Sequence, residues 1–184
     1  VYWRRRIVVL GGVLAVIAVV VLIIVRPGFG ANQGSTQDET DAMNQGPTLA
    51  TCLPSQIELV ARTDRNSYDS GMNPQLWMGI RNISTVDCVV EVGTDVQRYE
   101  ISSGNDLIWI SSHCQTDAVP FPVTLLAGSE QETAAIPWDR TRSAVDTCAT
   151  PETRPVMRAG GSSYHLRVFL GDLESAETRQ FLLN

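Results

Sequence analysis

A run of nineteen residues without a charged or strongly polar side chain, Ile7 to Val25, constrains this chain more than any other feature. At about 1.5 Å per residue, a helix of that length spans the hydrocarbon core of a bilayer. Three arginines, Arg4 to Arg6, precede the run, and the cytoplasmic flank of a first span carries an excess of Lys and Arg. The sequence therefore predicts a single-pass protein of the cell membrane, with a cytoplasmic N-terminus and an extracytoplasmic C-terminal domain.

A cleaved signal peptide is the alternative interpretation of this apolar run. The hydrophobic part of a signal peptide is about 7–15 residues long and ends at a small-residue cleavage site. Here the run is longer, Arg26-Pro27 follows it, and the best cleavage candidate, Gly28-Phe29-Gly30, is poor. We therefore predict an uncleaved anchor, with residues 1–26 forming the basic flank and the transmembrane helix.

Two further regions follow the anchor. Residues 27–50 are rich in Gly, Asn, Gln, Ser, Thr and Asp, and so polar a composition does not form a packed core. We predict a flexible linker there, with a reach of about 25–30 Å. Residues 51–184 have the length of one domain with a substantial core.

The charge of the exported part limits its partners. The whole chain has a formal net charge of −6, and from Cys52 onward the sequence contains ten Arg and seventeen Asp or Glu. An acidic domain is a poor ligand for nucleic acid and for anionic lipid headgroups. We therefore predict no nucleic-acid partner.

Short alternating runs separated by turn residues dominate the sequence after Cys52. In the clearest run, Tyr164 to Leu170, apolar residues alternate with His165 and Arg167, which is typical of a strand with one buried face. The other predicted strands are Gln56–Arg62, Leu76–Arg81, Cys88–Val92, Arg98–Ser102, Leu107–Ser111, Val123–Leu125, Glu132–Trp138 and Thr178–Leu183.

The connections between these strands complete the prediction of the fold. We expect the second and third strands to form a hairpin across residues 82–87, and the fourth and fifth to form another across residues 103–106. Residues 66–74 and 139–162 are expected to be loops. Short strands at this spacing, without a helix outside the membrane, predict an all-β domain, either a sandwich or a barrel.

Four cysteines, Cys52, Cys88, Cys114 and Cys148, lie on the predicted exported side. An even number in an oxidising compartment predicts two disulfides, and the sequence leaves all three connectivities open. No CxxC pair is present and the chain has two histidines, so a zinc site is not expected.

No constellation of catalytic residues is recognisable. His113 and His165 are the only imidazoles, and no GxSxG, SxxK or HExxH motif accompanies them. Asp64, Asp69 and Asp106 lie in predicted loops and could hold calcium, but they lack the spacing of an EF-hand. We predict no enzyme activity and no catalytic, cofactor or metal site.

Two smaller features have both a structural and a functional interpretation. The default expectation for Trp77, Trp109 and Trp138 is burial in the core, and a platform for stacking a ligand is the alternative. The tripeptide Asn82-Ile83-Ser84 matches a glycosylation sequon.

Four short motifs resemble a known family. They are Leu107-Ile108-Trp109-Ile110-Ser111, Pro122-Val123-Thr124-Leu125-Leu126-Ala127-Gly128-Ser129-Glu130, Ile136-Pro137-Trp138-Asp139 and Ala159-Gly160-Gly161-Ser162-Ser163-Tyr164-His165-Leu166-Arg167-Val168. Their order resembles the intracellular proteinase inhibitor domain family (BsuPI), over about residues 75–183. The resemblance implies an immunoglobulin-like β-sandwich. It also suggests inhibition of an extracytoplasmic protease, with the cysteine-bearing insert 139–162 as the candidate loop.

A second resemblance bears on the disulfides. Cys52, then Ile80-Arg81-Asn82-Ile83-Ser84, then Cys88 is similar to secreted actinobacterial domains of unknown function. In those domains an N-terminal cysteine is bonded to one that follows a turn containing Asn. This resemblance implies the pairs Cys52–Cys88 and Cys114–Cys148.

The functional prediction combines the anchor, the fold and the missing catalytic motifs. We expect a non-enzymatic protein of the cell envelope whose exported domain contacts another protein, for example as an accessory subunit of a membrane or cell-wall complex. Edge strands and end loops of sandwiches suit such contacts. Inhibition of an extracytoplasmic protease is the alternative function.

Overall fold

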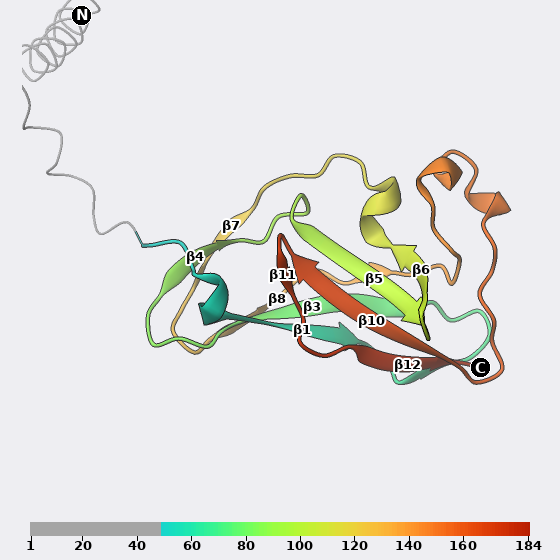
Figure 1. Ribbon diagram of the computed structural model, residues 1–184, viewed down its shortest axis with the longest axis horizontal. Helices are drawn as coiled ribbons and strands as arrows, with labels where there is room; N and C mark the ends of the chain where they lie inside the picture. Colours follow the sequence, from blue (N-terminus) through green and yellow to red (C-terminus); the bar gives the residue numbers. More distant parts are fainter. Residues whose placement is uncertain (1–48) are drawn as a thin grey trace, which may run out of the picture. The chain divides into compact units, whose positions relative to one another are not determined.

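The computed structural model describes residues 49–184, which form an all-β domain (Figure 1). The all-β prediction is thereby confirmed for these residues. The predicted membrane span, Ile7 to Val25, and most of the predicted linker lie outside the described residues. No helix within residues 49–184 is long and apolar enough to cross a membrane.

The strands are short, and single turns of 3-10 helix interrupt the connections between them. The strands are β1 (Ile57–Thr63), β2 (Ser67–Tyr68), β3 (Gln75–Asn82), β4 (Cys88–Glu91), β5 (Gln97–Ser103), β6 (Asp106–Ile110), β7 (Pro122–Leu125), β8 (Glu130–Glu132), β9 (Ile136–Pro137), β10 (Ser162–Leu170), β11 (Leu173–Glu174) and β12 (Arg179–Leu183). The 3-10 turns are η1 (Pro54–Gln56), η2 (Ser111–Cys114), η3 (Val145–Thr147) and η4 (Pro151–Thr153).

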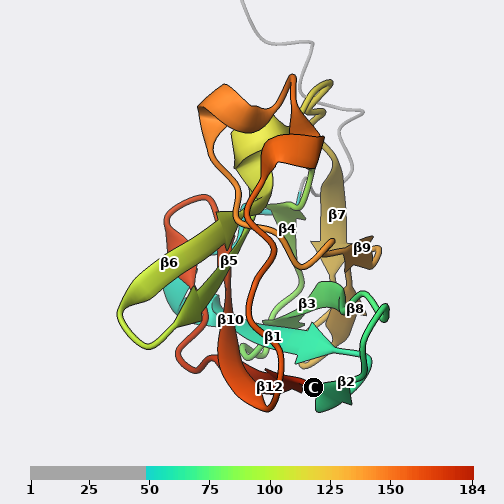
Figure 2. The same cartoon turned by 90° about the vertical axis from the view of Figure 1, so that its right-hand side faces the viewer.

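Two larger sheets enclose one hydrophobic core (Figure 2). One sheet has the order β1-β3-β8, with β9 also paired to β3, and the other has the order β2-β12-β10-β5-β6, with β11 paired to β10. Strands β4 and β7 form a separate two-stranded sheet. The fully buried core side chains come from both larger sheets and include Leu76, Met78, Ile101, Leu166, Val168 and Leu183.

Strand β10 confirms the alternation read from the sequence. Tyr164, Leu166, Val168 and Leu170 are buried, whereas the intervening His165 and Arg167 are only half-buried. Burying this one face stabilises the domain by roughly 1.5–3 kcal/mol for each large apolar side chain. The period of two residues therefore fixes which face of the strand enters the core.

The three tryptophans take different positions. Trp138 is fully buried, as predicted, and its ring lies edge-on to Tyr164 and Phe181 with centroids 5.4 and 6.0 Å away. Trp109 is half-buried and packs against the core. Trp77 is half-buried on the face of β3 opposite to the core residues, so the prediction of a core position is wrong for this residue.

The predicted hairpin between β3 and β4 is wrong. Strand β3 is bordered by β1 on one edge and by β8 and β9 on the other, so neither edge is available to β4. Strand β4 pairs instead with β7, and Val89 forms a parallel bridge with Thr51 on the other edge of β4. The predicted hairpin of β5 and β6 across residues 103–106 is confirmed.

Two predicted segments differ in detail. Residues 66–74 are a loop except for β2, which pairs in parallel with the end of β12. The predicted strand Glu132–Trp138 is divided into β8 and β9. It breaks at Thr133, whose backbone N–H donates to the Met78 carbonyl (3.0 Å) and whose hydroxyl accepts from the Met78 N–H (3.1 Å). Residues 139–162 are irregular before β10, as predicted.

Both predicted disulfides are present, with the pairing that the second resemblance implies. Cys52 is bonded to Cys88 and Cys114 to Cys148, with Cα atoms 4.9 and 5.3 Å apart. The first bridge joins the segment before η1 to the start of β4, and the second joins η2 to the long insert after Trp138. The first bridge therefore fixes the segment before η1 against β4, and the second fixes the insert against η2.

Candidate functional site

Three loop segments meet at one end of the domain: the segment leading into β1, the β3–β4 connection and the turn after β7. The Ile83 N–H donates to the Gln56 carbonyl (2.8 Å), and the Asn82 N–H donates to the Ser129 carbonyl (2.9 Å). The Cys52–Cys88 disulfide joins the first two segments. These bonds bring residues far apart in the sequence onto one surface.

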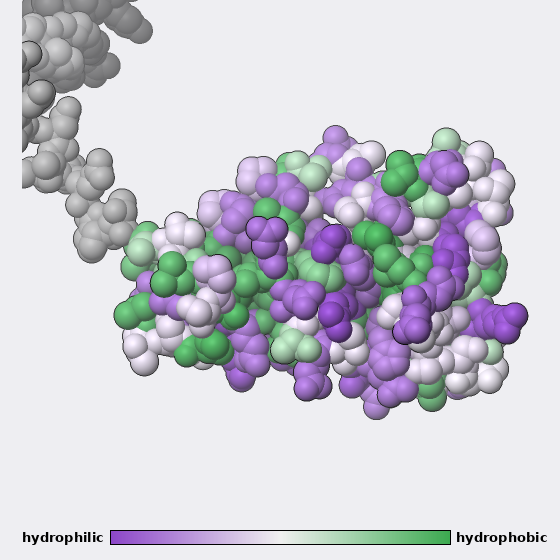
Figure 3. Space-filling view, viewed as in Figure 1, coloured by the Kyte–Doolittle hydropathy of each residue, from purple (hydrophilic) through white to green (hydrophobic). Residues whose placement is uncertain are grey.

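Large apolar side chains are exposed on this surface. We name it the apolar end surface, and it consists of Leu49, Leu53, Ile83, Val86 and Leu126, each at least 44% exposed. Figure 3 shows hydrophobic side chains gathered at the end of the domain that carries β4 and β7. Scattered apolar side chains on a surface need no explanation, but a contiguous group usually marks an interaction site.

The apolar end surface has almost no charge. Asp87 is the only charged residue within residues 49–56, 82–89 and 125–129, and its carboxylate accepts a hydrogen bond from the Ala127 N–H (2.8 Å). These segments also contain no aromatic residue. A surface that binds lipid headgroups usually carries Lys, Arg, Trp or Tyr, and these three segments contain none of them.

The buried side chain of Asn82 joins two of these segments, the β3–β4 connection and the end of β7. Its side chain is fully buried, and its Nδ2 donates to the carbonyls of Val86 (2.8 Å) and Leu125 (3.2 Å). Its Oδ1 accepts from the backbone N–H (3.0 Å) and the hydroxyl (2.7 Å) of Ser84. Because this amide is enclosed and bonded on both sides, the sequon at Asn82 does not present a glycan acceptor in the folded domain.

The apolar end surface was not predicted from the sequence. Ile83 and Val86 lie in the predicted turn 82–87, and Leu126 lies just beyond the predicted strand Val123–Leu125. The available signal was the occurrence of large apolar residues inside predicted turns, where alternation cannot bury them.

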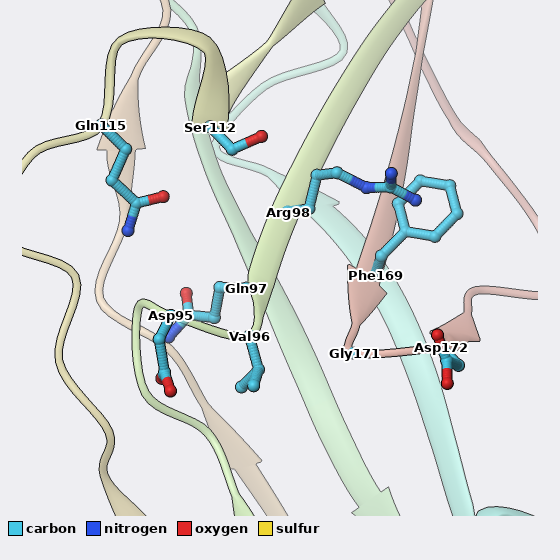
Figure 4. A pocket seen from close by; sticks show the side chains of 9 residues that line it. All are labelled: Asp95, Val96, Gln97, Arg98, Ser112, Gln115, Phe169, Gly171 and Asp172. Atoms are coloured by element: carbon cyan, nitrogen blue, oxygen red, sulfur yellow. The ribbon is translucent and has the colours of Figure 1, made fainter.

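Hollows on the side of the domain form a second candidate site. One, of about 390 Å³, opens beside β7 and β8 and has a mostly apolar lining that includes Val119 and Phe121. Another, of about 410 Å³, is polar (Figure 4). There the Arg98 guanidinium lies 4.0 Å from the Phe169 ring centroid and 3.4 Å from the Glu100 carboxylate. Arg98 is the one cationic residue that lines the polar hollow, and it already contacts Phe169 and Glu100 of the same domain.

Neither histidine belongs to an assembled catalytic group. The His113 Nδ1 lies 2.8 Å from the Ser143 hydroxyl, but that hydroxyl also accepts the N–H of Ile110 and is nearly buried. No carboxylate within residues 49–184 is hydrogen-bonded to His113. His165 is hydrogen-bonded to the Thr178 hydroxyl (3.2 Å). The contacts of both imidazoles are those of structural residues.

The three aspartates considered for calcium are engaged separately. Asp64 accepts hydrogen bonds from the Tyr68 hydroxyl (2.6 Å) and the Gln75 N–H (2.9 Å), Asp69 accepts one from the Asn184 amide, and Asp106 forms an ion pair with Arg142. Burial raises the pKa of Asp64, but its hydrogen bonds outweigh this effect, so the pKa lies below its ordinary value. No group of three His, Cys, Asp or Glu residues in the described part of the chain could hold a metal ion.

The pair of Tyr68 and Asp64 makes the free energy of unfolding depend on pH in the alkaline range. Burial, followed by the hydrogen bond to Asp64, raises the pKa of Tyr68 from 10.0 to about 12. The stabilisation from this group is fully present below pH 10, where the unfolded phenol is neutral, and is lost as the pH rises toward 12. We expect the free energy of unfolding of Tyr68→Phe, measured in urea, to fall less steeply over this range than that of the wild type. Equal slopes for the two proteins would contradict this assignment.

Comparison with known proteins shows remote structural likeness alone. No family model matches the chain, and no curated protein matches it. Among solved structures, it is similar to a β-glucosidase from Listeria innocua in complex with isofagomine (12% identity, TM-score 0.34, covering 68% of this chain and 16% of that chain). It is also similar to Spo0M, a sporulation control protein from Bacillus subtilis (9% identity, TM-score 0.34, covering 70% and 49%). The chain spans about half the length of Spo0M and a smaller part of the β-glucosidase. Likeness at this level carries no argument about function.

Proposed function

We propose that this chain is a non-enzymatic, single-pass protein of the cell envelope whose exported domain binds another protein through the apolar end surface. The observation that carries the proposal is the exposure of Leu53, Ile83, Val86 and Leu126 on a surface with one charged residue, Asp87. Burying such side chains against a partner stabilises a complex, because apolar area leaves water.

Two observations support the location. Both disulfides, Cys52–Cys88 and Cys114–Cys148, close within the domain, and stable disulfides are typical of proteins outside the cytoplasm. The apolar run Ile7–Val25 and the arginines before it support an anchor with the domain on the outer side.

The topology supports an immunoglobulin-like β-sandwich. The chain leaves the first sheet after β1 and enters the second at β2, which pairs in parallel with β12. The two larger sheets share one core, and the pairs β1–β3, β5–β6 and β10–β12 are antiparallel. Two antiparallel sheets around one core are the basis of this architecture.

The test compares two charge substitutions at opposite surfaces of the full-length protein. Tagged protein is purified from native membranes in a gentle detergent, and retained proteins are identified by mass spectrometry. We expect a stoichiometric partner, retained at high salt, whose affinity falls roughly 30-fold in Ile83→Asp, because losing a central contact costs about 2 kcal/mol or more.

The matched control is Val156→Asp, which introduces the same charge at an exposed valine of the insert. This variant should retain the partner as well as the wild type does. A partner that binds Ile83→Asp with unchanged affinity would remove the apolar end surface from the proposal.

Protease inhibition is the second candidate, and one observation favours it. The insert 139–162 is anchored by the Cys114–Cys148 disulfide and by buried Arg140, whose Nη1 donates to the Asp69 carbonyl (2.8 Å). It nevertheless presents Val145 and Val156 with at least 70% of each side chain exposed. A fixed loop with protruding side chains can occupy a protease cleft with little loss of entropy.

The same two variants separate this function from the first. Inhibition of envelope proteases by the full-length protein should be lost in Val156→Asp and unchanged in Ile83→Asp. Deleting the insert is a poor test, because the deletion would also remove the bond from Arg140 to Asp69 and one half of a disulfide. Inhibition that survives Val156→Asp and Val145→Asp together would exclude the insert as the inhibitory element.

A further inference from the structure

The Cys114–Cys148 disulfide differs from the other disulfide in its surroundings. The Arg154 Nη2 lies 3.1 Å from the Cys114 Sγ, so a full positive charge contacts one sulfur of this bond. At Cys88 the contacting group is instead the neutral amide of Asn82, whose Nδ2 lies 3.6 Å from the sulfur. A cation beside a sulfur stabilises the thiolate that forms when a disulfide is reduced.

Arg154 is held beside the sulfur by partners on its other nitrogens. Its Nε donates to the Thr147 carbonyl (3.3 Å), and its Nη1 lies 3.8 Å from the Asp139 carboxylate. The side chain is 11% exposed, so water and salt screen its charge less than that of a surface arginine. Because the three contacts use different nitrogens, Nη2 stays directed at the Cys114 sulfur.

Access to solvent also separates the two disulfides. Cys88 is 2% exposed at the start of β4, although its partner Cys52 is half-buried. Both Cys114 and Cys148 are half-buried, the first at the end of η2 and the second just after η3. Reduction begins when an external thiolate attacks a disulfide sulfur, so access limits the rate. Among residues 49–184, the Cys114–Cys148 bond is therefore the disulfide that a reductant reaches more readily.

This bond ties the tip of the insert, residues 144–154, to the body of the domain. No residue of the tip is buried, and within residues 49–184 no backbone hydrogen bond joins the tip to a residue outside the insert. Its backbone bonds are internal, as from the Thr147 N–H to the Ala144 carbonyl (3.1 Å). Breaking the disulfide therefore releases the tip.

The base of the insert is held independently of the disulfide. The Ser143 N–H donates to the Ile108 carbonyl of β6 (3.1 Å), and the Arg142 N–H donates to the Pro155 carbonyl (2.9 Å) on the returning strand of the loop. These bonds close the insert below its tip. Release on reduction is therefore local and leaves the two larger sheets assembled.

We propose that Cys114–Cys148 is a thiol–disulfide exchange site whose substrate is a dithiol reductant. A thiolate of the dithiol bonds to the Cys148 Sγ while the S–S bond breaks, and the electron pair of that bond goes to the Cys114 Sγ, where Arg154 balances its charge. The second thiol of the reductant loses its proton and displaces Cys148 from the mixed disulfide. The dithiol is thereby oxidised to a disulfide, Cys148 takes up a proton from water, and the tip of the insert is free.

The first test compares the two disulfides in one sample. Full-length protein in detergent is treated with dithiothreitol for graded times, and the freed thiols are alkylated and quantified at each cysteine by mass spectrometry. Cys114 and Cys148 should be freed at least about tenfold faster than Cys52 and Cys88. Reduction of Cys52–Cys88 first, or at the same rate, overturns the proposal.

Variants of Arg154 test the role of the charge. Arg154→Gln should slow reduction of Cys114–Cys148 about tenfold, and Arg154→Lys should keep most of the wild-type rate. The Cys52–Cys88 bond is the internal control and should react at the wild-type rate in both variants. If Arg154 only held the tip in place, both variants would expose the bond and speed its reduction, and that result overturns the proposal.

A monothiol shows which sulfur is attacked. After brief treatment with 2-mercaptoethanol, the adduct should be found on Cys148 and the free thiol at Cys114, because the sulfur beside Arg154 is the leaving group. An adduct found mainly on Cys114 contradicts the assigned direction.

Release of the tip is measured with a glutamate-specific protease, since Glu152 is exposed in the tip. Cleavage after Glu152 should accelerate once Cys114–Cys148 is reduced and Cys52–Cys88 is still intact. The double variant of Cys114 and Cys148 to Ala should be cleaved at that faster rate without reductant. Cleavage at an unchanged rate after selective reduction would show that the tip stays docked, and would overturn its release.

Discussion

Reduction of both disulfides is expected to lower the melting temperature of the domain by about 30 °C, roughly 15 °C for each bridge. Each bridge closes a loop of about the same length, with sequence separations of 36 and 34. A loop of that size is worth about 3–4 kcal/mol, mainly because the crosslink restricts the unfolded chain. At this domain size each kcal/mol shifts the melting temperature by about 3–5 °C. Thermal unfolding of the full-length protein in detergent, with and without reductant, measures the effect.

Replacing the cysteines in pairs should separate the two bridges. The double variant of Cys52 and Cys88 to Ala releases a segment of the apolar end surface, so it should weaken partner binding as well as stability. The double variant of Cys114 and Cys148 to Ala frees the insert, so it should lower stability and leave partner binding at the apolar end surface unchanged. Labelling of all four thiols in the native, non-reduced protein would contradict the disulfide assignment.

The sequence was a good guide to individual strands, because burial on one face imposes a local period. Strands β1, β3, β5, β6, β10 and β12 all fall where alternation predicted them. The same local information gave the wrong partner for β4. The hairpin prediction relied on closeness in sequence, whereas the pairing of β4 depends on Thr51 and on β7.

The candidate site could not be predicted for a related reason. Its side chains belong to three loops whose proximity follows from the β1–β3 register, from a disulfide and from the amide of Asn82. None of these is a local pattern. The sequence showed apolar residues such as Ile83 inside a turn, but it could not show that Leu53 and Leu126 share their surface.

Asn82→Ala is expected to lower the free energy of unfolding by about 3 kcal/mol or more. The substitution removes all the side-chain hydrogen bonds of a fully buried residue and leaves the Leu125 carbonyl without the amide that binds it. An unsatisfied buried polar group costs about 1–3 kcal/mol. Here the Leu125 and Val86 carbonyls both lose the amide of Asn82, although the Val86 carbonyl retains the Ser84 hydroxyl as a donor (3.1 Å). Urea denaturation of the full-length protein, with the slope compared to the wild type, measures the loss.

Ser84→Ala is the matched control, since it removes one hydroxyl partner of Asn82 at a half-buried position. We expect it to cost less than about 1 kcal/mol, because the amide of Asn82 retains its bonds to both carbonyls. Equal losses for the two variants would show that the Ser84 hydroxyl contributes as much as the buried amide of Asn82, which would contradict the role given to the amide.

Asn82→Asp tests the direction of the hydrogen bonds. The carboxylate keeps an acceptor for Ser84 but faces the carbonyls of Val86 and Leu125 without a proton to donate, so the variant should be less stable than Asn82→Ala at neutral pH. Protonation restores a donor, and these surroundings raise the pKa of the new carboxyl in the folded state. Its destabilisation should therefore shrink as the pH is lowered, and a variant whose relative stability is independent of pH would contradict the donor role of Asn82.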